Sequence, residues 1–155
     1  MSSTGAGRTT QTQASRGVRV ANRVLLFLLR AGVPVGPMRI LTVRGRRSWR
    51  ARSTPVTPVQ VGGHRYLVQA FPRAAWVENA RATGWASLGR GRRRDRVRLV
   101  ELEPAERVAV LRELPTLNAR AAAVFVNNGI ADAATPEAFA AAAPRSVVFR
   151  VEVVG

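Results

Sequence analysis

The sequence predicts a mainly β domain with flanking helices, folded as a small antiparallel barrel. Short strand-like segments recur along the chain, turn residues separate them, and no strand-helix-strand rhythm of the kind that builds a parallel sheet is present. Closure into a barrel is the expected packing, because it hides strand edges that would otherwise pair with other chains. The length of 155 residues and the 46% hydrophobic content suit one domain.

The first 32 residues divide into two predicted segments, and residues 33–155 form the predicted barrel domain. Residues 1–14 are small and polar, which is typical of a disordered tail. Residues 15–32 have the periodicity of an amphipathic helix. Its basic stripe contains Arg16, Arg19, Arg23 and Arg30, with Asn22 beside it, and one apolar row contains Val20, Val24, Phe27 and Ala31. Two interpretations stay open: packing on its own domain or a partner subunit, or contact with a membrane surface.

The next segments predict strands joined by turns. Residues 38–43 predict a strand, an arginine-rich turn follows, and residues 51–61 predict a second strand. Pro55 and Pro58 place that second strand at a sheet edge, a bulge or a bend, because proline cannot donate a ladder hydrogen bond. Gly62-Gly63 is a strong two-residue hairpin signal, after which residues 64–71 return antiparallel.

The second half of the chain mixes helices and strands. A proline at a first helical turn, and a threonine before proline and glutamate, mark two helix starts. The predicted elements are a helix over 73–82, a strand over 84–89, a turn over 90–94, a strand over 95–102, a helix over 104–114, a helical or irregular stretch over 115–134, a helix from 135 and a strand over 146–154.

Composition excludes several kinds of chemistry. The chain has no cysteine, so disulfides, thiolate metal sites and a cysteine nucleophile are excluded. His64 is the single histidine, which rules out a multi-histidine metal site, and no G-x-S-x-G motif accompanies it. We therefore expect no metal and no covalent nucleophile, and the sequence identifies no catalytic side chain.

The charge of the chain points to an anionic partner. The net charge is +16, every basic residue is arginine, and thirteen arginines precede the first acidic residue, Glu78. The stretch "RGRRSWRAR" (44–52) concentrates five of them, and its glycine permits a tight turn whose N–H groups can cradle an anion. From the residues alone, three interpretations stay open: a solvated basic loop, a nucleic-acid patch, or a cradle for an anionic small ligand.

Three motifs in order resemble a known family. They read "LTVRGRRSWRARSTPV" (41–56), "YLVQAFPRAAWVENARA" (66–82) and "APRSVVFR" (143–150). Together they resemble the deazaflavin-dependent nitroreductase family of split β-barrel, FMN-binding-like oxidoreductases, over roughly residues 18–152. Trp49 stands where the family pattern has the second glycine of the turn, and the tyrosines of some relatives' substrate pockets have no match here.

The resemblance implies a split antiparallel β-barrel that binds the deazaflavin coenzyme F420 and transfers hydride to a quinone, nitroaromatic or enone acceptor. It also implies a homodimer. By matching position, the residues implied to bind the phosphate and oligoglutamate tail are Arg46, Arg47, Ser48 and Arg52. Those implied to lie beside the deazaflavin ring are Pro55, Val56 and Thr57. Those implied to cover the other side of the coenzyme are Ala70, Phe71, Arg73, Ala74, Ala75 and Trp76. Arg44 and Arg50 are expected to be solvated, and water is the expected proton donor.

Two other functions remain as alternatives. The same barrel could carry FMN, haem or another anionic cofactor without catalysis. A basic nucleic-acid-binding module is the second alternative, but aromatic residues make up only 6% of the chain and no recognition helix is evident. The apolar run "VLLFLL" (24–29) is too short to span a bilayer, so we expect a cytoplasmic protein, with helix 15–32 as the part that could lie at the inner membrane surface.

Overall fold

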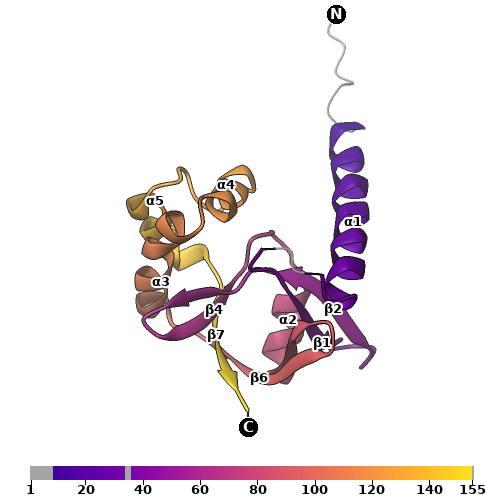
Figure 1. Ribbon diagram of the computed structural model, residues 1–155. Helices are drawn as coiled ribbons and strands as arrows, with labels where there is room; N and C mark the ends of the chain where they lie inside the picture. The colour runs from indigo at the N-terminus through magenta and orange to yellow at the C-terminus, as the bar shows by residue number, and fades with distance from the viewer. Residues whose placement is uncertain (1–8, 34–35, 155) are drawn as a thin grey trace, which may run out of the picture.

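The computed structural model of the chain describes the backbone of residues 9–33 and 36–154, and side chains from Arg19 onward within those ranges (Figure 1). Its centre is one antiparallel sheet of seven strands in the order β2-β1-β5-β6-β7-β4-β3. The strands are β1 (Arg39–Arg44), β2 (Ala51–Val56), β3 (Val59–Val61), β4 (His64–Val68), β5 (Trp85–Arg90), β6 (Arg93–Glu101) and β7 (Val148–Val153).

The sheet curls because its two edge strands are neighbours in sequence. β2 and β3 lie at opposite edges of the sheet, yet only Thr57 and Pro58 separate them. A connection of this length spans roughly 10 Å at most, so the two edges must come close together. The result is a split β-barrel, as predicted. Pro55 lies in an edge strand, also as predicted, but residues 51–61 form two strands and not one, which raises the strand count to seven.

Two of the three hairpin turns in the sheet contain glycine with a positive φ. Gly62 and Gly63 have φ values of 57° and 78° and join β3 to β4, which confirms the predicted two-residue turn. The hairpin between β5 and β6, which contains Gly91 at a φ of 59°, is tighter than predicted. Arg90 pairs with Arg93, so residues 93 and 94 belong to β6 and not to a turn over 90–94. Along β6, exposed arginines alternate with buried Val97 and Leu99.

The first helix is longer than the sequence pattern predicts. α1 runs over Thr9–Arg30, so it begins within the predicted tail; residues 1–8 of that tail lie outside the described residues. Its last turn rests on the β5–β6 hairpin, where the Gly91 N–H donates to the Leu29 carbonyl at 2.8 Å. A β-carbon at Gly91 would lie 3.1 Å from Gly32 Cα, which is tighter than ordinary contact. This end of α1 is therefore fixed by backbone contacts.

The remaining helices are α2 (Ala75–Thr83), α3 (Pro104–Leu117), α4 (Ala119–Asn127), α5 (Pro136–Ala141) and the short 3-10 helix η1 (Ala143–Arg145). Of these, α3, α4 and α5 group together on one side, whereas α2 lies apart from them and packs against β1 (Figure 1). Thr135 caps α5 as predicted, accepting from Ala138 N at 3.2 Å, and Asn118 caps α4 in the same way. The stretch predicted as helical or irregular over 115–134 is both: it contains the end of α3, then α4, and then turns and bends over 128–134.

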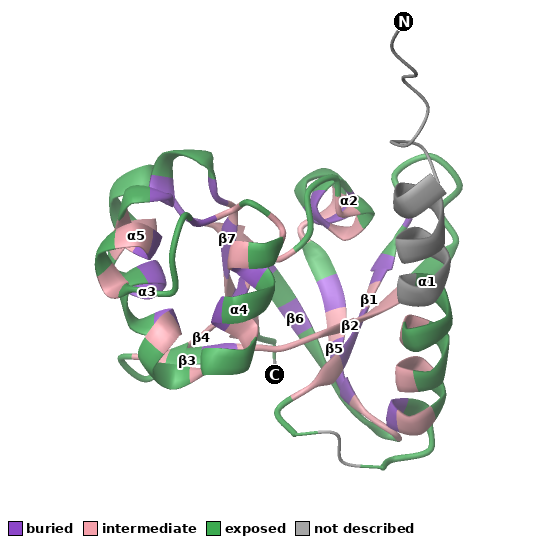
Figure 2. Ribbon diagram, turned by 90° about the horizontal axis from the view of Figure 1, so that it is seen from above, coloured by how far each residue is buried: buried purple, intermediate pink, exposed green. Residues whose placement is uncertain are grey.

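The core has two parts (Figure 2). One lies inside the curled sheet and includes Leu41, Val97 and Phe149, and the other lies under α3, α4 and α5 and includes Leu111 and Phe139. α1 contributes little to either, because most of its described side chains are exposed. Within the described residues, no helix is long and apolar enough to cross a membrane.

Candidate functional site

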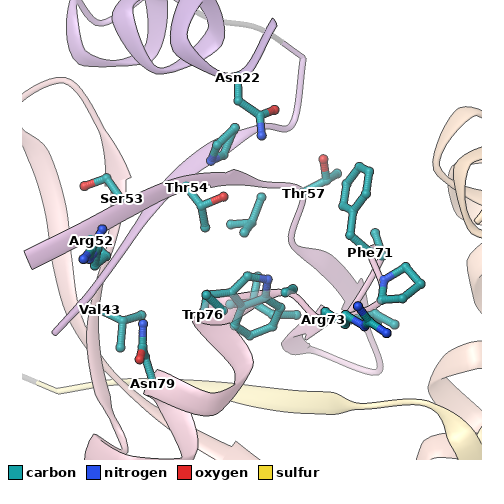
Figure 3. Close-up of a pocket in the computed structure, with 18 of the residues that line it drawn as sticks. Asn22, Val43, Arg52, Ser53, Thr54, Thr57, Phe71, Arg73, Trp76 and Asn79 are labelled. Carbon is teal, nitrogen blue, oxygen red and sulfur yellow. The ribbon is translucent and has the colours of Figure 1, made fainter. Parts of the chain in front are cut away.

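One large cavity lies against the curled sheet, with a volume of about 1160 Å³ (Figure 3). Its walls come from α1, the turn between β1 and β2, the edge strand β2, the loop before α2, and α4. All thirteen residues that the motif resemblance singled out line it: Arg46, Arg47, Ser48, Arg52, Pro55, Val56, Thr57, Ala70, Phe71, Arg73, Ala74, Ala75 and Trp76.

The arginine turn is a compact loop closed by its own backbone. The Gly45 N–H donates to Arg50 O at 2.8 Å, and the Trp49 N–H donates to Gly45 O at 2.9 Å. A β-carbon at Gly45 would come within 2.8 Å of Ser48 Oγ, so a larger residue there would displace the Ser48 hydroxyl. Ser48 Oγ in turn accepts from Arg50 N at 3.3 Å.

Trp49 occupies the position of the family's second glycine and adopts a φ of 59°. This left-handed region favours glycine, because a β-carbon crowds the backbone there. The turn therefore has a backbone that suits glycine even though tryptophan is present. The indole itself is 67% exposed and does not line the cavity.

The arginines of the turn divide into two groups. Arg46, Arg47 and Arg52 line the cavity, whereas Arg44 and Arg50 are exposed and do not. Arg44 is not only solvated, because its Nη1 donates to Trp49 O at 3.0 Å and so braces the turn. Arg46 is tied to α2 through Asn79, whose Oδ1 accepts from Arg46 N at 3.1 Å and from Arg46 Nη1 at 3.0 Å.

The edge strand β2 gives the cavity a wall of mixed character. Ser53 Oγ lies 2.9 Å from Thr42 Oγ1 on the neighbouring strand, so these two hydroxyls satisfy each other. Thr54 and Thr57 line the cavity and make no side-chain hydrogen bond among the described residues. Pro55 and Val56 add apolar surface beside them. This wall suits a flat ring that needs apolar contact and a few polar partners.

The loop before α2 forms the facing wall. Asn128 of α4 donates through Nδ2 to Ala70 O at 2.7 Å, and Gln69 donates through Nε2 to Phe71 O at 2.9 Å. Arg73 has a φ of 62°, the second residue other than glycine with positive φ in the described part of the chain. Trp76 lines the cavity and packs against Phe149, with ring centroids 5.6 Å apart.

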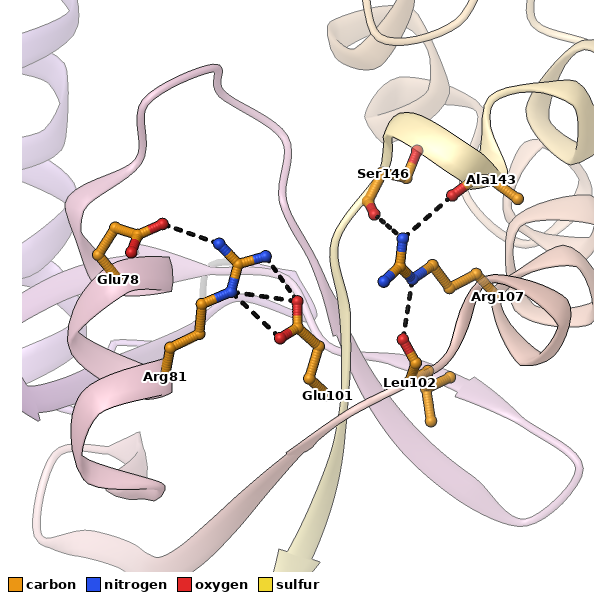
Figure 4. Close-up of polar contacts among 7 residues, drawn as sticks. All are labelled: Glu78, Arg81, Glu101, Leu102, Arg107, Ala143 and Ser146. Carbon is orange, nitrogen blue, oxygen red and sulfur yellow. Dashed lines mark hydrogen bonds and ion pairs between the residues drawn. The ribbon is translucent and has the colours of Figure 1, made fainter.

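Positive charge at the cavity is left unpaired, whereas a nearby arginine is neutralised. Arg81 of α2 donates to Glu101 at 2.6 Å and to Glu78 at 2.8 Å (Figure 4). The Glu101 hydrogen bonds, and those of Glu78, raise the pKa of Arg81. Arg46, Arg47, Arg52 and Arg73 form no ion pair with any described carboxylate. The cavity therefore presents free cationic groups to a ligand.

Two walls of the cavity, formed by α1 and α4, were not predicted from the sequence. Arg19, Asn22 and Leu25 of α1 line it, as do Ala121, Val124, Phe125 and Asn128 of α4. The α1 residues are spaced three apart, so they share one helix face, and that spacing was a usable signal. The α4 residues lie in the stretch predicted only as helical or irregular, and no pattern in the sequence linked them to the distant motifs.

Fold and site together define a class of protein. A split barrel with a cavity that combines apolar walls, an aromatic neighbour and unpaired arginines is suited to a flat cofactor with an anionic tail. A family model described as F420H(2)-dependent quinone reductase matches residues 28–128, and the chain belongs to this family. The protein is an oxidoreductase with coenzyme F420 as its cofactor, and it transfers hydride to quinone-type acceptors.

Comparison with solved structures gives distant matches. The protein Atu2129 from Agrobacterium tumefaciens str. C58, of unknown function, is 14% identical with a TM-score of 0.52; the match covers 100% of this chain and 58% of that one, and it supports the fold alone. A structure described as a domain-swapped dimer is 21% identical, with a TM-score of 0.48 and coverage of 90% and 99%. An F420-H2 dependent reductase, FDR-A, is 19% identical, with a TM-score of 0.39 and coverage of 75% and 94%. No curated protein matches the sequence.

Proposed function

We propose that the cavity holds coenzyme F420 with its ring against β2 and its anionic tail on the arginine turn. Arg46, Arg47 and Arg52 would bind the phosphate and the oligoglutamate, while Pro55, Val56 and Thr57 would contact the ring. The loop from Ala70 to Trp76 would cover the other side. The observation that carries this proposal is that all thirteen residues, taken from the first two motifs and the adjoining Thr57, line one cavity.

The residues present fit the coenzyme in chemistry as well as in space. Guanidinium groups offer several donors in a fixed plane, which matches phosphate and carboxylate oxygens. The volume of about 1160 Å³ leaves room for an acceptor beside the coenzyme. When bound, reduced F420 supplies the hydride. The chain itself supplies orientation and positive electrostatic potential.

Protonation of the reduced acceptor falls to water in this proposal. Among the described residues, the cavity lining contains no carboxylate, histidine or tyrosine. Its hydroxyls, including those of Thr54 and Thr57, can orient a water molecule or an acceptor oxygen by hydrogen bonding. The cationic lining would stabilise the oxyanion that a quinone becomes after it accepts hydride.

We further propose that the acceptor range extends to nitroaromatics and enones. The α4 wall is apolar, with Ala121, Val124 and Phe125 facing the cavity. Such a wall selects by shape and area and not by a specific hydrogen bond, so it suits several flat electron-poor acceptors. An acceptor screen with the reduced coenzyme, with a quinone as reference, measures this range directly.

The first experiment is a tryptophan-quenching titration of the full chain. Oxidised F420, FMN and a short DNA duplex are added in parallel at about 0.15 M salt, where exposed charges are well screened. Saturable quenching by F420 at low micromolar concentration supports the proposed site. Saturation by FMN or DNA with none by F420 would overturn it and favour a cofactor carrier or a nucleic-acid-binding protein.

For α1 we propose contact with an anionic membrane surface on the cytoplasmic side. Val20, Val24 and Phe27 form one row and are 60%, 53% and 72% exposed, while Arg19, Arg23 and Arg30 lie on the same helix. Exposed apolar side chains flanked by arginines suit the interface of an anionic bilayer. This leaves the opposite helix face, with Asn22 and Leu25, toward the cavity.

Flotation with vesicles tests the membrane proposal. The full chain should float with vesicles that contain anionic lipid, and the variant Val20→Ser, Val24→Ser, Phe27→Ser should not. A second copy of the chain is the competing partner for this row, since the family resemblance also implies a homodimer. A dimer in sedimentation that dissociates in the triple variant, together with no flotation of the full chain, would overturn membrane contact.

A further inference from the structure

Asn79 is one of two polar side chains that are buried in the described part of the chain, with 4% of its surface exposed. It lies on α2, and its Oδ1 accepts two hydrogen bonds from a residue 33 positions away. One comes from Arg46 N at 3.1 Å and the other from Arg46 Nη1 at 3.0 Å. A single amide oxygen therefore fixes both the backbone and the guanidinium of Arg46.

This arrangement restricts Arg46 before any ligand arrives. A free arginine side chain loses rotamer freedom when it binds an anion, and that loss weakens binding. Because Nη1 already points at Asn79, the direction of the guanidinium plane is set. Arginine has five N–H donors, and the bond to Asn79 takes only one from the side chain, so the others remain free for a ligand.

The neutral amide matters as much as the position. On the same helix, Arg81 is also held in place, but by the carboxylates of Glu101 and Glu78, which neutralise it (Figure 4). Asn79 holds Arg46 without adding negative charge beside a site for an anion. Two arginines are therefore held by hydrogen bonds that involve α2. The carboxylates neutralise Arg81, whereas the amide of Asn79 leaves Arg46 with its full positive charge.

We propose that Asn79 is a positioning residue that presents Arg46 to the anionic tail of the coenzyme. Asn79 also lines the cavity (Figure 3), but its Oδ1 is occupied by the two hydrogen bonds from Arg46, so in this proposal it acts through Arg46. This inference rests on the proposed function of the arginine turn. The competing explanation is that Asn79 only holds the arginine turn against α2. In that case any side chain with a well-placed hydrogen-bond acceptor at position 79 would support coenzyme binding equally well.

The test compares two ligands with two variants. Binding of F420 and of a tail-less deazaflavin, which lacks the phosphate and the oligoglutamate, is measured by fluorescence titration. Asn79→Ala should weaken F420 binding by about 10-fold, the effect expected for one charge-assisted contact. Affinity for the tail-less compound should stay within about 2-fold, since no charge-assisted contact is involved.

Asn79→Asp separates the two explanations. Aspartate keeps the size of the side chain and its acceptor oxygen. If residue 79 only holds the turn against α2, the Asn79→Asp variant should hold it as well as asparagine does, or better. Positioning of a free charge predicts instead that F420 binding weakens by about 10-fold or more, because the new carboxylate neutralises Arg46. This variant keeps the proposal testable even if Asn79→Ala unfolds, which a thermal melt reveals.

Two controls complete the design. Thr83→Ala removes a side-chain hydrogen bond to Asn79 O on the same helix, 3.0 Å long, and should leave both affinities unchanged. In an Arg46→Ala background, Asn79→Ala should cause no further loss. Equal losses for both ligands, or F420 binding to Asn79→Asp at the unaltered strength, would overturn the positioning role. Failure of the unaltered chain to bind F420 would instead overturn the proposed function.

Discussion

At the scale of single residues, Trp49 is the position where sequence and backbone disagree. Its φ of 59° lies in the left-handed region, where a β-carbon costs roughly 1–2 kcal/mol. Its indole is 67% exposed, so burial recovers little of that cost. The hydrogen bond from Trp49 N to Gly45 O and the one that Trp49 O accepts from Arg44 hold the residue in place.

Trp49→Gly should therefore raise the free energy of unfolding by about 1 kcal/mol, because the strain disappears while the turn keeps its bonds. Urea denaturation monitored by circular dichroism measures the change. Trp49→Ala is the matched control, since it removes the indole and keeps the β-carbon. An equal gain in both variants would show that the indole, and not the backbone, is the source of the cost.

Arg47 and Arg52 should bind the anionic part of the coenzyme. Replacing both by alanine is expected to weaken F420 binding by about 2 to 4 kcal/mol, if each makes one charge-assisted contact. Isothermal titration gives the affinity. Arg50→Ala removes the same charge from an exposed position of the same turn and should have a small effect. Unchanged affinity in the double variant would contradict the proposal that Arg47 and Arg52 bind the anionic part of the coenzyme.

At the scale of elements, one arginine joins the helical layer to the sheet. Arg107 of α3 donates to Leu102 O at 2.9 Å, to Ser146 O at 2.7 Å and to Ala143 O at 3.3 Å (Figure 4). These carbonyls belong to the connection after β6, to η1 and to the segment before β7. The guanidinium therefore fixes where the chain leaves the sheet and where it returns.

Arg107→Met should lower the free energy of unfolding by about 3 kcal/mol, because partly buried carbonyls lose a charged donor. Methionine retains much of the length and the apolar contact of the stem. Chemical denaturation compares it with Arg112→Met, which alters an exposed position of the same helix. Similar small losses in the two variants would show that the three carbonyl bonds contribute little.

At the scale of the whole molecule, the net charge of +16 creates a field that should attract a polyanion before contact. Stopped-flow measurements should show that the association rate for F420 falls by about 10-fold or more between low and physiological salt. The tail-less deazaflavin should associate at a nearly constant rate. A flat rate for F420 would mean that the arginines act only at short range.

Much of this architecture was predictable because the residues that begin and end its helices and strands are recognisable from short stretches of sequence. Gly62-Gly63, Pro104 and Thr135 each mark an element boundary that the structure contains. The start of α1 was not predictable from residues 9–14, which lack an apolar row, and the division of residues 51–61 depends on how the sheet closes. The motif residues of the cavity were found by resemblance, but the α4 wall depends on tertiary packing that no short pattern encodes.

The close approach of Gly91 to Gly32 bears on how such an enzyme could diversify. Arg19, Asn22 and Leu25 reach the cavity from a helix whose C-terminal end is pinned by that glycine contact and by the bond from Gly91 N to Leu29 O. A side chain at position 91 would force Gly32 to give way by a few tenths of an ångström. Such a displacement at one end of α1, which also contacts β1 and β2, would shift Arg19 and Asn22 slightly relative to the cavity. A change on a surface hairpin, remote from coenzyme and acceptor, could in this way alter which acceptors the pocket admits.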